Sequence, residues 1–339
     1  MRHPYLLLLC FATVLAAYES APAEIITDGR TIGDAYVSDE NLDCVNFVIG
    51  DPRSAVKSSL TRKQYKRIQY GDAKDMNYKT AEVFADRGEM AKAADSYRKA
   101  IDSASYQWVV ERSYLRAVQC LIDPKVNKPD DGLKLADDFL LKFPKSVNIA
   151  ELTTLRGDLR LAKGDLVGAD ADYAAIEKNA DAWGVSRARA VVGRANVLRR
   201  GKKYTEALAL IQPVFASSKA DQDPEGWARL GMSLADFFHL AAQKDEAIKT
   251  LRLIAFSPAS APDRCAAHLR LAKVLMEGAT GDALVRAFDH AVLAALLGAD
   301  DAIDAEARVW VKKLAALIDK DKSLPEEDRK EYRDYARNL

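Results

Sequence analysis

The sequence predicts a mainly α fold, in which a right-handed α-solenoid of about six helix pairs spans residues 73–318. A small β module at residues 24–72 precedes the pairs, and a charged helix at residues 319–339 follows them. Three observations lead to this prediction. Small residues recur at two positions of a period of 36 to 40 residues, Gly-containing turns separate the apolar segments, and helix breakers are few, with 17 Gly and 11 Pro among 339 residues.

The first 23 residues have the pattern of a signal peptide. A short basic start precedes an apolar run of 12 residues, 6–17, which is too short to span a bilayer with ease. Ala21-Pro22-Ala23 then supplies an A-x-A cleavage site. We expect an exported protein, periplasmic or secreted, that is cleaved after Ala23. Cleavage after Ala17 and an uncleaved anchor are the alternatives.

Charge and cysteine content exclude several classes of function. Lys plus Arg and Asp plus Glu both number 50, so the formal net charge is zero and the chain has no general attraction for nucleic acid. Of the four cysteines, Cys10 lies in the signal segment, and the mature chain keeps Cys44, Cys120 and Cys265. Three widely spaced cysteines are not the pattern of a disulfide framework. No stretch after the signal segment approaches about 18 apolar residues, so we expect no transmembrane segment after cleavage.

The β module is predicted from turn signals between short apolar runs. Asp28-Gly29 indicates a hairpin, and residues 42–49 show partial alternation of apolar residues. Residues 54–60 and 68–70 are expected to be the last strands, with a short helical turn at residues 61–66. The segment resembles small SH3-like or Sm-like β-barrel modules. A plain strand meander packed on the first helices is the alternative.

Two series of small residues define the repeats. The first is Ala81, Ala117, Gly157, Ala195, Ala235 and Ala272; the second is Ala93, Gly132, Ala169, Ala207, Ala247 and Leu284, where the last member is bulky. Helices approach closely only where the side chains at the crossing are small, so each series marks a close contact within a helix pair. The arrangement resembles the tetratricopeptide repeat (TPR) family, which implies antiparallel helix pairs that stack into an array.

The turns and the end of the array are also predicted. Gly88, Gly164 and Gly201 are expected to end first helices, since Gly adopts the left-handed conformation of a C-cap. Units two and six depart from the pattern through longer internal loops. Residues 303–318 are predicted to cover the open end of the last pair, and residues 326–337 to form a charged helix with a frayed end.

The resemblance also implies a binding surface. In this family the ninth position of each first helix points into the concave groove, and here it is occupied by Glu82, Val118, Asp158, Asn196, Asp236 and Lys273. Apart from Val118, these are the predicted binding residues, and the acids among them suggest a basic or amide-rich partner segment. The alternative is a merely solvated face. Asn196 matches the family's carboxylate clamp, but the basic companions of that clamp are absent, so no clamp is expected.

No catalytic constellation is recognisable, and we expect no enzyme activity, cofactor or metal. His239, His268 and His290 lie in predicted helices, where a structural or surface role is the usual one. The sequence therefore predicts a non-enzymatic protein–protein interaction scaffold or adaptor of the bacterial cell envelope. A polysaccharide- or polymer-binding structural protein is the alternative. An enzyme with its site in the N-terminal module is weaker, because residues 24–72 hold no His and one Cys. The oligomeric state is left open.

Overall fold

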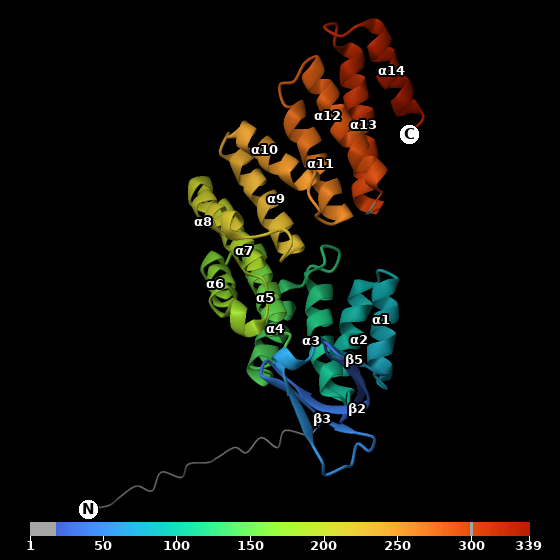
Figure 1. Cartoon of the computed structure of the whole chain (residues 1–339), viewed down its shortest axis with the longest axis vertical. Coiled ribbons are helices and arrows are strands. Elements are labelled where there is room, and N and C mark those ends of the chain that lie inside the picture. The colour runs from blue at the N-terminus through green and yellow to red at the C-terminus, as the bar shows by residue number, and fades with distance from the viewer. Residues whose placement is uncertain (1–17, 299–300) are drawn as a thin grey trace, which may run out of the picture. The chain divides into compact units, whose positions relative to one another are not determined.

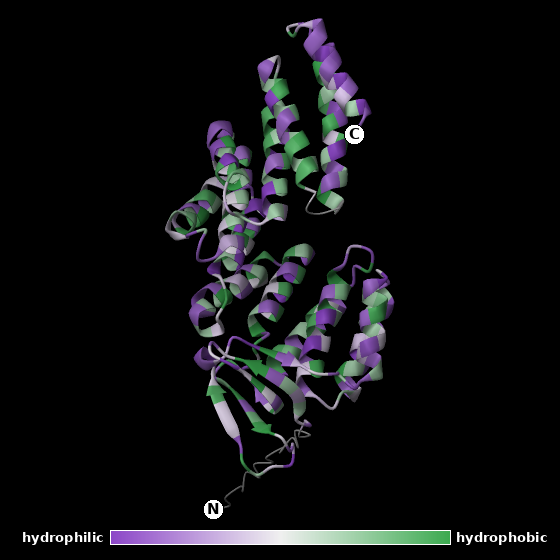
Figure 2. Cartoon of the chain, turned by 45° about the vertical axis from the view of Figure 1, so that its right-hand side comes forward, coloured by the Kyte–Doolittle hydropathy of each residue, from purple (hydrophilic) through white to green (hydrophobic). Residues whose placement is uncertain are grey.

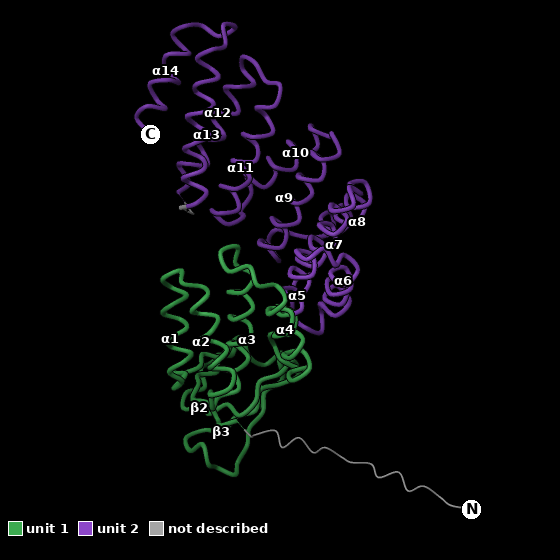
Figure 3. Tube along the Cα trace, turned by 180° about the vertical axis from the view of Figure 1, so that it is seen from behind, with its two compact units in different colours: residues 1–152 green, residues 153–339 purple. Residues whose placement is uncertain are grey.

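The computed structural model describes residues 18–298 and 301–339 (Figure 1). In these ranges the chain forms a five-stranded sheet followed by 14 α-helices. It divides into two compact units, one up to Leu152 and one from Thr153 to Leu339 (Figure 3). The predicted mainly α fold with a small N-terminal β module is confirmed.

The sheet is antiparallel and is built as the turn signals predict. Its strands are β1 (Ala21–Ile26), β2 (Thr31–Glu40), β3 (Cys44–Ile49), β4 (Ser58–Thr61) and β5 (Arg67–Tyr70), in the order β4-β3-β2-β1-β5. The Asp28-Gly29 hairpin is confirmed, since the Thr27 amide donates to the Arg30 carbonyl at 2.9 Å. A 3₁₀ turn at Arg62–Gln64 leads into β5, which returns beside β1. β4 and β5 are the two edges, so the sheet is open in its hydrogen bonding.

Two antiparallel helix pairs complete the first unit. They are α1 (Met76–Asp86) with α2 (Met90–Ser103), and α3 (Gln107–Ile122) with α4 (Pro129–Lys142). The small residues Ala81, Ala93 and Ala117 are fully buried at the predicted crossings. The sheet packs against α3, where the rings of Tyr70 and Trp108 stack with their centroids 5.0 Å apart.

The second unit continues the pattern of paired helices. After α5 (Ile149–Lys163), within which the boundary between the units falls, it contains α6 (Leu166–Trp183), α7 (Arg187–Arg200), α8 (Tyr204–Ser217), α9 (Pro224–Leu240), α10 (Lys244–Ala255), α11 (Ala261–Met276), α12 (Asp282–Leu297), α13 (Asp301–Lys320) and α14 (Glu326–Arg337). Gly157, Ala195, Ala235 and Ala272 are buried at the predicted contacts. The handedness of the superhelix stays a prediction.

The predicted end helix and the charged helix form one more pair. α13 packs on α12, and α14 packs on α13. Figure 2 shows α14, which runs to the C label, as mostly hydrophilic, but one side of it is anchored. Phe288 meets the ring of Tyr332 edge-on at 5.0 Å, and Arg329 donates to the Asp319 carbonyl at 2.9 Å. These contacts anchor the first part of α14, and the fraying of its end stays a prediction.

One aromatic ring shows why small residues are needed at the crossings. Tyr173, on α6, lies between Gly157 of α5 and Gly193 of α7. A Cβ atom built on Gly157 would lie 2.9 Å from the ring, and one on Gly193 only 2.5 Å from it. The Tyr173 side chain is fully buried and therefore has no space into which it could withdraw.

The turn glycines behave as predicted at two of three places. Gly88 and Gly164 have φ values of +73° and +83°, in the left-handed region that Gly tolerates. At the third turn Gly201 has a φ of −85°, and Lys202 adopts the left-handed conformation with a φ of +57°. At the end of α7 the left-handed conformation is therefore adopted by Lys202, one residue after the Gly that was predicted to adopt it.

The residues directly after the apolar run belong to the first unit. The predicted signal segment up to Ala17 lies outside the described residues. Beyond it, the Glu19 amide donates to the Ser105 carbonyl at 2.9 Å, and Ala21 is buried in the core. Cleavage after Ala23 would cut through β1, whereas cleavage after Ala17 would leave the strand whole. Among the described helices, none has the length and apolarity needed to cross a bilayer.

Candidate functional site

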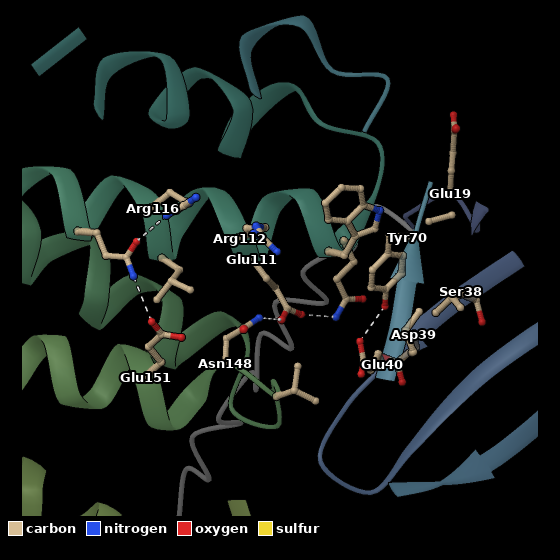
Figure 4. A pocket seen from close by; sticks show the side chains of 18 residues that line it. Glu19, Ser38, Asp39, Glu40, Tyr70, Glu111, Arg112, Arg116, Asn148 and Glu151 are labelled. Carbon is tan, nitrogen blue, oxygen red and sulfur yellow. Dashed lines mark hydrogen bonds between the residues drawn. The ribbon is translucent and has the colours of Figure 1, made fainter. Parts of the chain in front are cut away.

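The first unit contains a pocket of about 390 Å³ between the sheet and α3 (Figure 4). β2 and β5 form one wall, α3 forms the other, and residues just before and in the first turn of α5 close one end. The lining residues are Glu19, Ala21, Val37, Ser38, Asp39, Glu40, Ile68, Tyr70, Gln107, Trp108, Glu111, Arg112, Leu115, Arg116, Gln119, Val147, Asn148 and Glu151.

Glu111 is the most deeply placed carboxylate of the pocket. Its side chain projects from α3 and the residue is 3% exposed. One oxygen accepts from the Gln107 amide at 2.7 Å, and the other accepts from the Ser146 hydroxyl and, at 3.2 Å, from the Asn148 amide. Burial raises the pKa of Glu111, and the nearby charge of Glu40 adds to that effect. All three donors are neutral, so they orient the carboxylate without compensating its charge.

Glu40 is held at the end of β2 by two tyrosines. Its Oε1 accepts from the Tyr65 hydroxyl at 3.1 Å, and its Oε2 accepts from the Tyr70 hydroxyl at 2.9 Å. Burial, together with the charge of Glu40, raises the pKa of Tyr65 to about 12 and raises that of Tyr70 as well. Both hydroxyls therefore stay protonated and act as donors at neutral pH. Figure 4 shows Glu40 and Glu111 near one another in the pocket.

Two neighbouring carboxylates, Asp39 and Glu151, also accept hydrogen bonds from neutral side chains. Asp39 accepts from the side-chain amides of Asn41 and Asn46 at 2.6 and 3.4 Å. Glu151, in the first turn of α5, accepts from the Gln119 amide at 3.1 Å. These bonds are made with neutral donors, so they position each carboxylate without placing a cation beside it.

Arg112 and Arg116 are the two cations of the lining. Arg112 is exposed on α3. Arg116 donates to Gln119 at 3.4 Å, and its Nε lies 3.6 Å from Glu82, which does not line the pocket. Five carboxylates therefore face two guanidinium groups, and one of these is shared with an acid outside the pocket. The pocket has an excess of negative charge at neutral pH.

The predicted binding residues of the first unit are engaged within the chain. Glu82 accepts a hydrogen bond from the Tyr97 hydroxyl and lies beside Arg116. Val118, the apolar exception in the row, is fully buried. Of the predicted row, the first unit therefore offers only Glu82, and this side chain already has two partners.

The row continues in the second unit, where most of its members also have partners. Asp158 accepts from the Tyr173 hydroxyl at 2.5 Å, Asp236 lies 3.5 Å from Arg270, and Lys273 lies 2.7 Å from Glu306. Asn196 is half-buried. Burial raises the pKa values of Asp158 and Asp236, while nearby arginines oppose the shift.

These partners change what the row can offer to a ligand. Asp236 and Lys273 each pair with a residue on the next first helix of the array. Asp236 therefore forms part of a ladder of ion pairs between neighbouring first helices, whereas Asp158 is held by the neutral hydroxyl of Tyr173. The predicted role of the row in binding stays a prediction, and the pocket of the first unit has a separate excess of acidic residues.

The sequence analysis missed this pocket. Its residues come from five separate segments between Glu19 and Glu151, and no short motif joins them. One signal was visible, since Glu111 follows the apolar run Trp108-Val109-Val110 in a predicted helix. A carboxylate on an apolar helix face needs partners when it is buried, and this marks it for attention.

No metal centre accompanies the pocket. Within residues 18–298 and 301–339, no group of three or more His, Cys, Asp or Glu side chains could hold a metal ion. His239 lies 3.3 Å from Glu277, and His268 and His290 contact each other in the second unit. Of the four cysteines, the three that lie in the described residues, Cys44, Cys120 and Cys265, are free thiols.

Comparison with known proteins finds likeness to solved structures of repeat proteins at low sequence identity. No family model and no curated protein matches the chain. A tetratricopeptide repeat protein from Parabacteroides merdae is 14% identical over 78% of this chain and all of its own, with a TM-score of 0.40. The pilF protein of Pseudomonas aeruginosa is 14% identical over 70% of this chain and 97% of its own, with a TM-score of 0.43. MamA from Desulfovibrio magneticus is 18% identical over 56% of this chain and 94% of its own, with a TM-score of 0.37.

Likeness at this level carries no conclusion about function. The fold itself stands on the helix pairs described above and on the buried small residues at their crossings. In fold, the helical part of the chain is similar to tetratricopeptide repeat proteins, as the spacing of its small residues predicts.

Proposed function

We propose that the chain is a non-enzymatic, exported scaffold of the bacterial cell envelope that binds a segment of another protein. The observation that carries this proposal is the pocket of the first unit. Its walls are a sheet and a helix, which are rigid elements, and the carboxylates of Asp39, Glu40, Glu111 and Glu151 are fixed by hydrogen bonds. A preorganised polar pocket loses little entropy on binding and is suited to recognising one side chain of a partner.

The repeated helix pairs support the same proposal. Stacked pairs produce a long surface from a modest core, and such surfaces suit extended ligands. The half-buried row of the second unit, with Asn196 as its member without a charge, can add contacts along a partner segment. The ladder of ion pairs in that row would fix the spacing between neighbouring first helices.

The proposal is tested by recovery of a partner from envelope extract. The full exported chain serves as bait, together with Glu19→Lys, which reverses an exposed charge of the pocket lining. Glu327→Lys, an exposed position on α14, is the matched control. We expect one protein to be recovered reproducibly by the wild type and by the control, and poorly by Glu19→Lys. Absence of any reproducible protein, or equal recovery by all three baits, contradicts the proposal.

A second candidate function follows from the aromatic wall of the pocket. Trp108 is half-buried and stacks on Tyr70, and paired aromatic rings also form platforms for sugar rings. This favours the polysaccharide-binding alternative over an enzyme. Retention on immobilised envelope polysaccharide that is lost in Trp108→Ala, with helix content unchanged, would support this alternative.

A further inference from the structure

We propose that the pocket between the sheet and α3 binds an organic cation, namely a guanidinium or ammonium group carried on an alkyl stem. The source is either an arginine or lysine side chain of a protein segment or a free polyamine. Only the first source rests on the proposed scaffold function. The ligand chemistry is inferred from the pocket itself.

The charge balance of the lining gives the sign of the ligand. Glu19, Asp39, Glu40, Glu111 and Glu151 line the pocket, whereas Arg112 and Arg116 are its only basic lining residues. The carboxylates of Asp39, Glu40, Glu111 and Glu151 accept hydrogen bonds from hydroxyl and amide groups, which are neutral. Grouping carboxylates away from water without a cation is costly, and a bound cation would relieve that cost.

The two central carboxylates have the capacity to accept further hydrogen bonds. Each oxygen of Glu40 accepts one tyrosine hydroxyl, and a carboxylate oxygen can accept two bonds. Glu111 is fixed by hydrogen bonds from Gln107, Ser146 and Asn148, so its side chain loses little conformational entropy when a ligand binds. A guanidinium or ammonium donor placed between the two acids would find acceptors already oriented.

The size and the remaining walls indicate an organic ion. A pocket of about 390 Å³ is far larger than a bare metal ion and lies in the range of small-molecule sites. Val37, Ile68 and Leu115 supply apolar surface for an alkyl stem. Trp108 of α3 and Tyr70 of β5 supply stacked aromatic rings to the lining, and aromatic faces attract organic cations.

The test is isothermal titration calorimetry on the full exported chain at low ionic strength. The probes are n-butylguanidinium and n-butylammonium, with the neutral n-butylurea as the matched control ligand. We expect both cations to bind, the urea to bind at least about tenfold more weakly, and added salt to weaken only the cations.

Two variants should move the affinity in opposite directions. Glu40→Gln removes one negative charge and should weaken cation binding about tenfold, whereas Arg112→Glu removes a positive charge and should strengthen it. Arg112 is exposed, so its substitution does not threaten the fold. Glu327→Gln on α14 is the control and should change nothing. Equal binding of cations and urea overturns the proposal, as does a cation affinity that neither pocket variant changes.

Two further probes identify the source of the cation. Acetyl-Gly-Arg-Gly-amide that binds more tightly than n-butylguanidinium assigns the site to a protein segment, and spermidine that binds more tightly than the peptide assigns it to a free polyamine. Cation binding without any recovered protein partner contradicts the scaffold proposal alone. A recovered partner with no cation binding contradicts the present inference alone.

Discussion

His268 on α11 and His290 on α12 face each other in the interior of the second unit, with their Nδ1 atoms 3.0 Å apart. At this distance one Nδ1 donates and the other accepts, so the accepting ring is neutral and the two rings cannot both be protonated while the bond is made. The ring of Phe256 meets His268 edge-on at 5.2 Å and covers the pair on one side. Burial lowers the pKa of both residues, that of His290 to about 4, and the nearby Arg264 and Arg252 act in the same direction.

The first prediction is a loss of stability in mild acid. Because the pKa values of the folded state lie below the ordinary value of about 6.5, the unfolded chain binds protons first as the pH falls. The contribution of the pair is complete above pH 6.5 and is lost as the pH falls from there toward about 4. Each proton adds a slope of at most about 1.4 kcal/mol per pH unit. The unfolding free energy of the wild type, measured by urea titration at several pH values between 7.5 and 4.5, gives this slope.

Two variants separate this effect from general acid destabilisation. His290→Gln removes one member of the pair and should flatten the dependence of unfolding free energy on pH. His239→Gln alters a partly exposed histidine outside the pair and should leave the dependence unchanged. Identical pH profiles for the wild type and His290→Gln would show that the pair is not the cause.

The second prediction concerns a buried carboxylate of the second unit. Asp172, on α6, is 2% exposed and accepts hydrogen bonds from Arg156 at 2.6 Å and from Arg160 at 2.9 Å. Asp172→Asn removes the buried carboxylate that these partly buried cations share and should cost about 3 kcal/mol of unfolding free energy. The matched control is Asp170→Asn, because Asp170 pairs with Arg194 at 3.0 Å but is exposed at the surface. Its cost should stay below about 1 kcal/mol, and equal losses would contradict the account.

The third prediction tests the close crossing at Tyr173. Gly193→Ala places a methyl group 2.5 Å from a ring that cannot move. Ala favours the helix over Gly by about 1 kcal/mol, but the steric clash with the ring outweighs this gain. We expect a net loss of about 1–3 kcal/mol of unfolding free energy. Tyr173→Leu should recover part of this loss in the Gly193→Ala background, so that the two changes are not additive in a double-mutant cycle. Additive losses would mean that the ring and the glycine are not in contact.

The fourth prediction concerns the start of the mature chain. Glu19, Ala21 and Pro22 make backbone or core contacts in the first unit, and Gly71 donates to the Pro22 carbonyl at 2.8 Å. We therefore expect the exported protein to begin at Tyr18, after cleavage behind Ala17, and N-terminal mass spectrometry measures this. A chain expressed from Glu24 should melt at a lower temperature than one expressed from Tyr18, because it lacks half of β1. A mature N-terminus at Glu24 with an equal melting temperature would contradict this.

Local patterns in the sequence were enough to predict most of the fold. The small residues Ala81, Ala117 and Ala195 mark helix crossings because a larger side chain would not fit between two closely packed helices. Asp28-Gly29 predicts its hairpin because only a few residue types adopt the turn. These are restrictions that a residue and its near neighbours impose by themselves, and so they can be read from the sequence.

The pocket and the ion pairs were decided by the tertiary structure alone. Glu40 and Glu111 are 71 positions apart (111 − 40), and only the packing of β2 against α3 brings their carboxylates into one pocket. The row of predicted binding residues gives a second example. The repeat period predicts the position of Asp236 in its helix, but it does not predict that Arg270 of α11 lies beside it. Which charges meet depends on how separate elements pack, and side chains that approach through space leave no periodic pattern in the sequence.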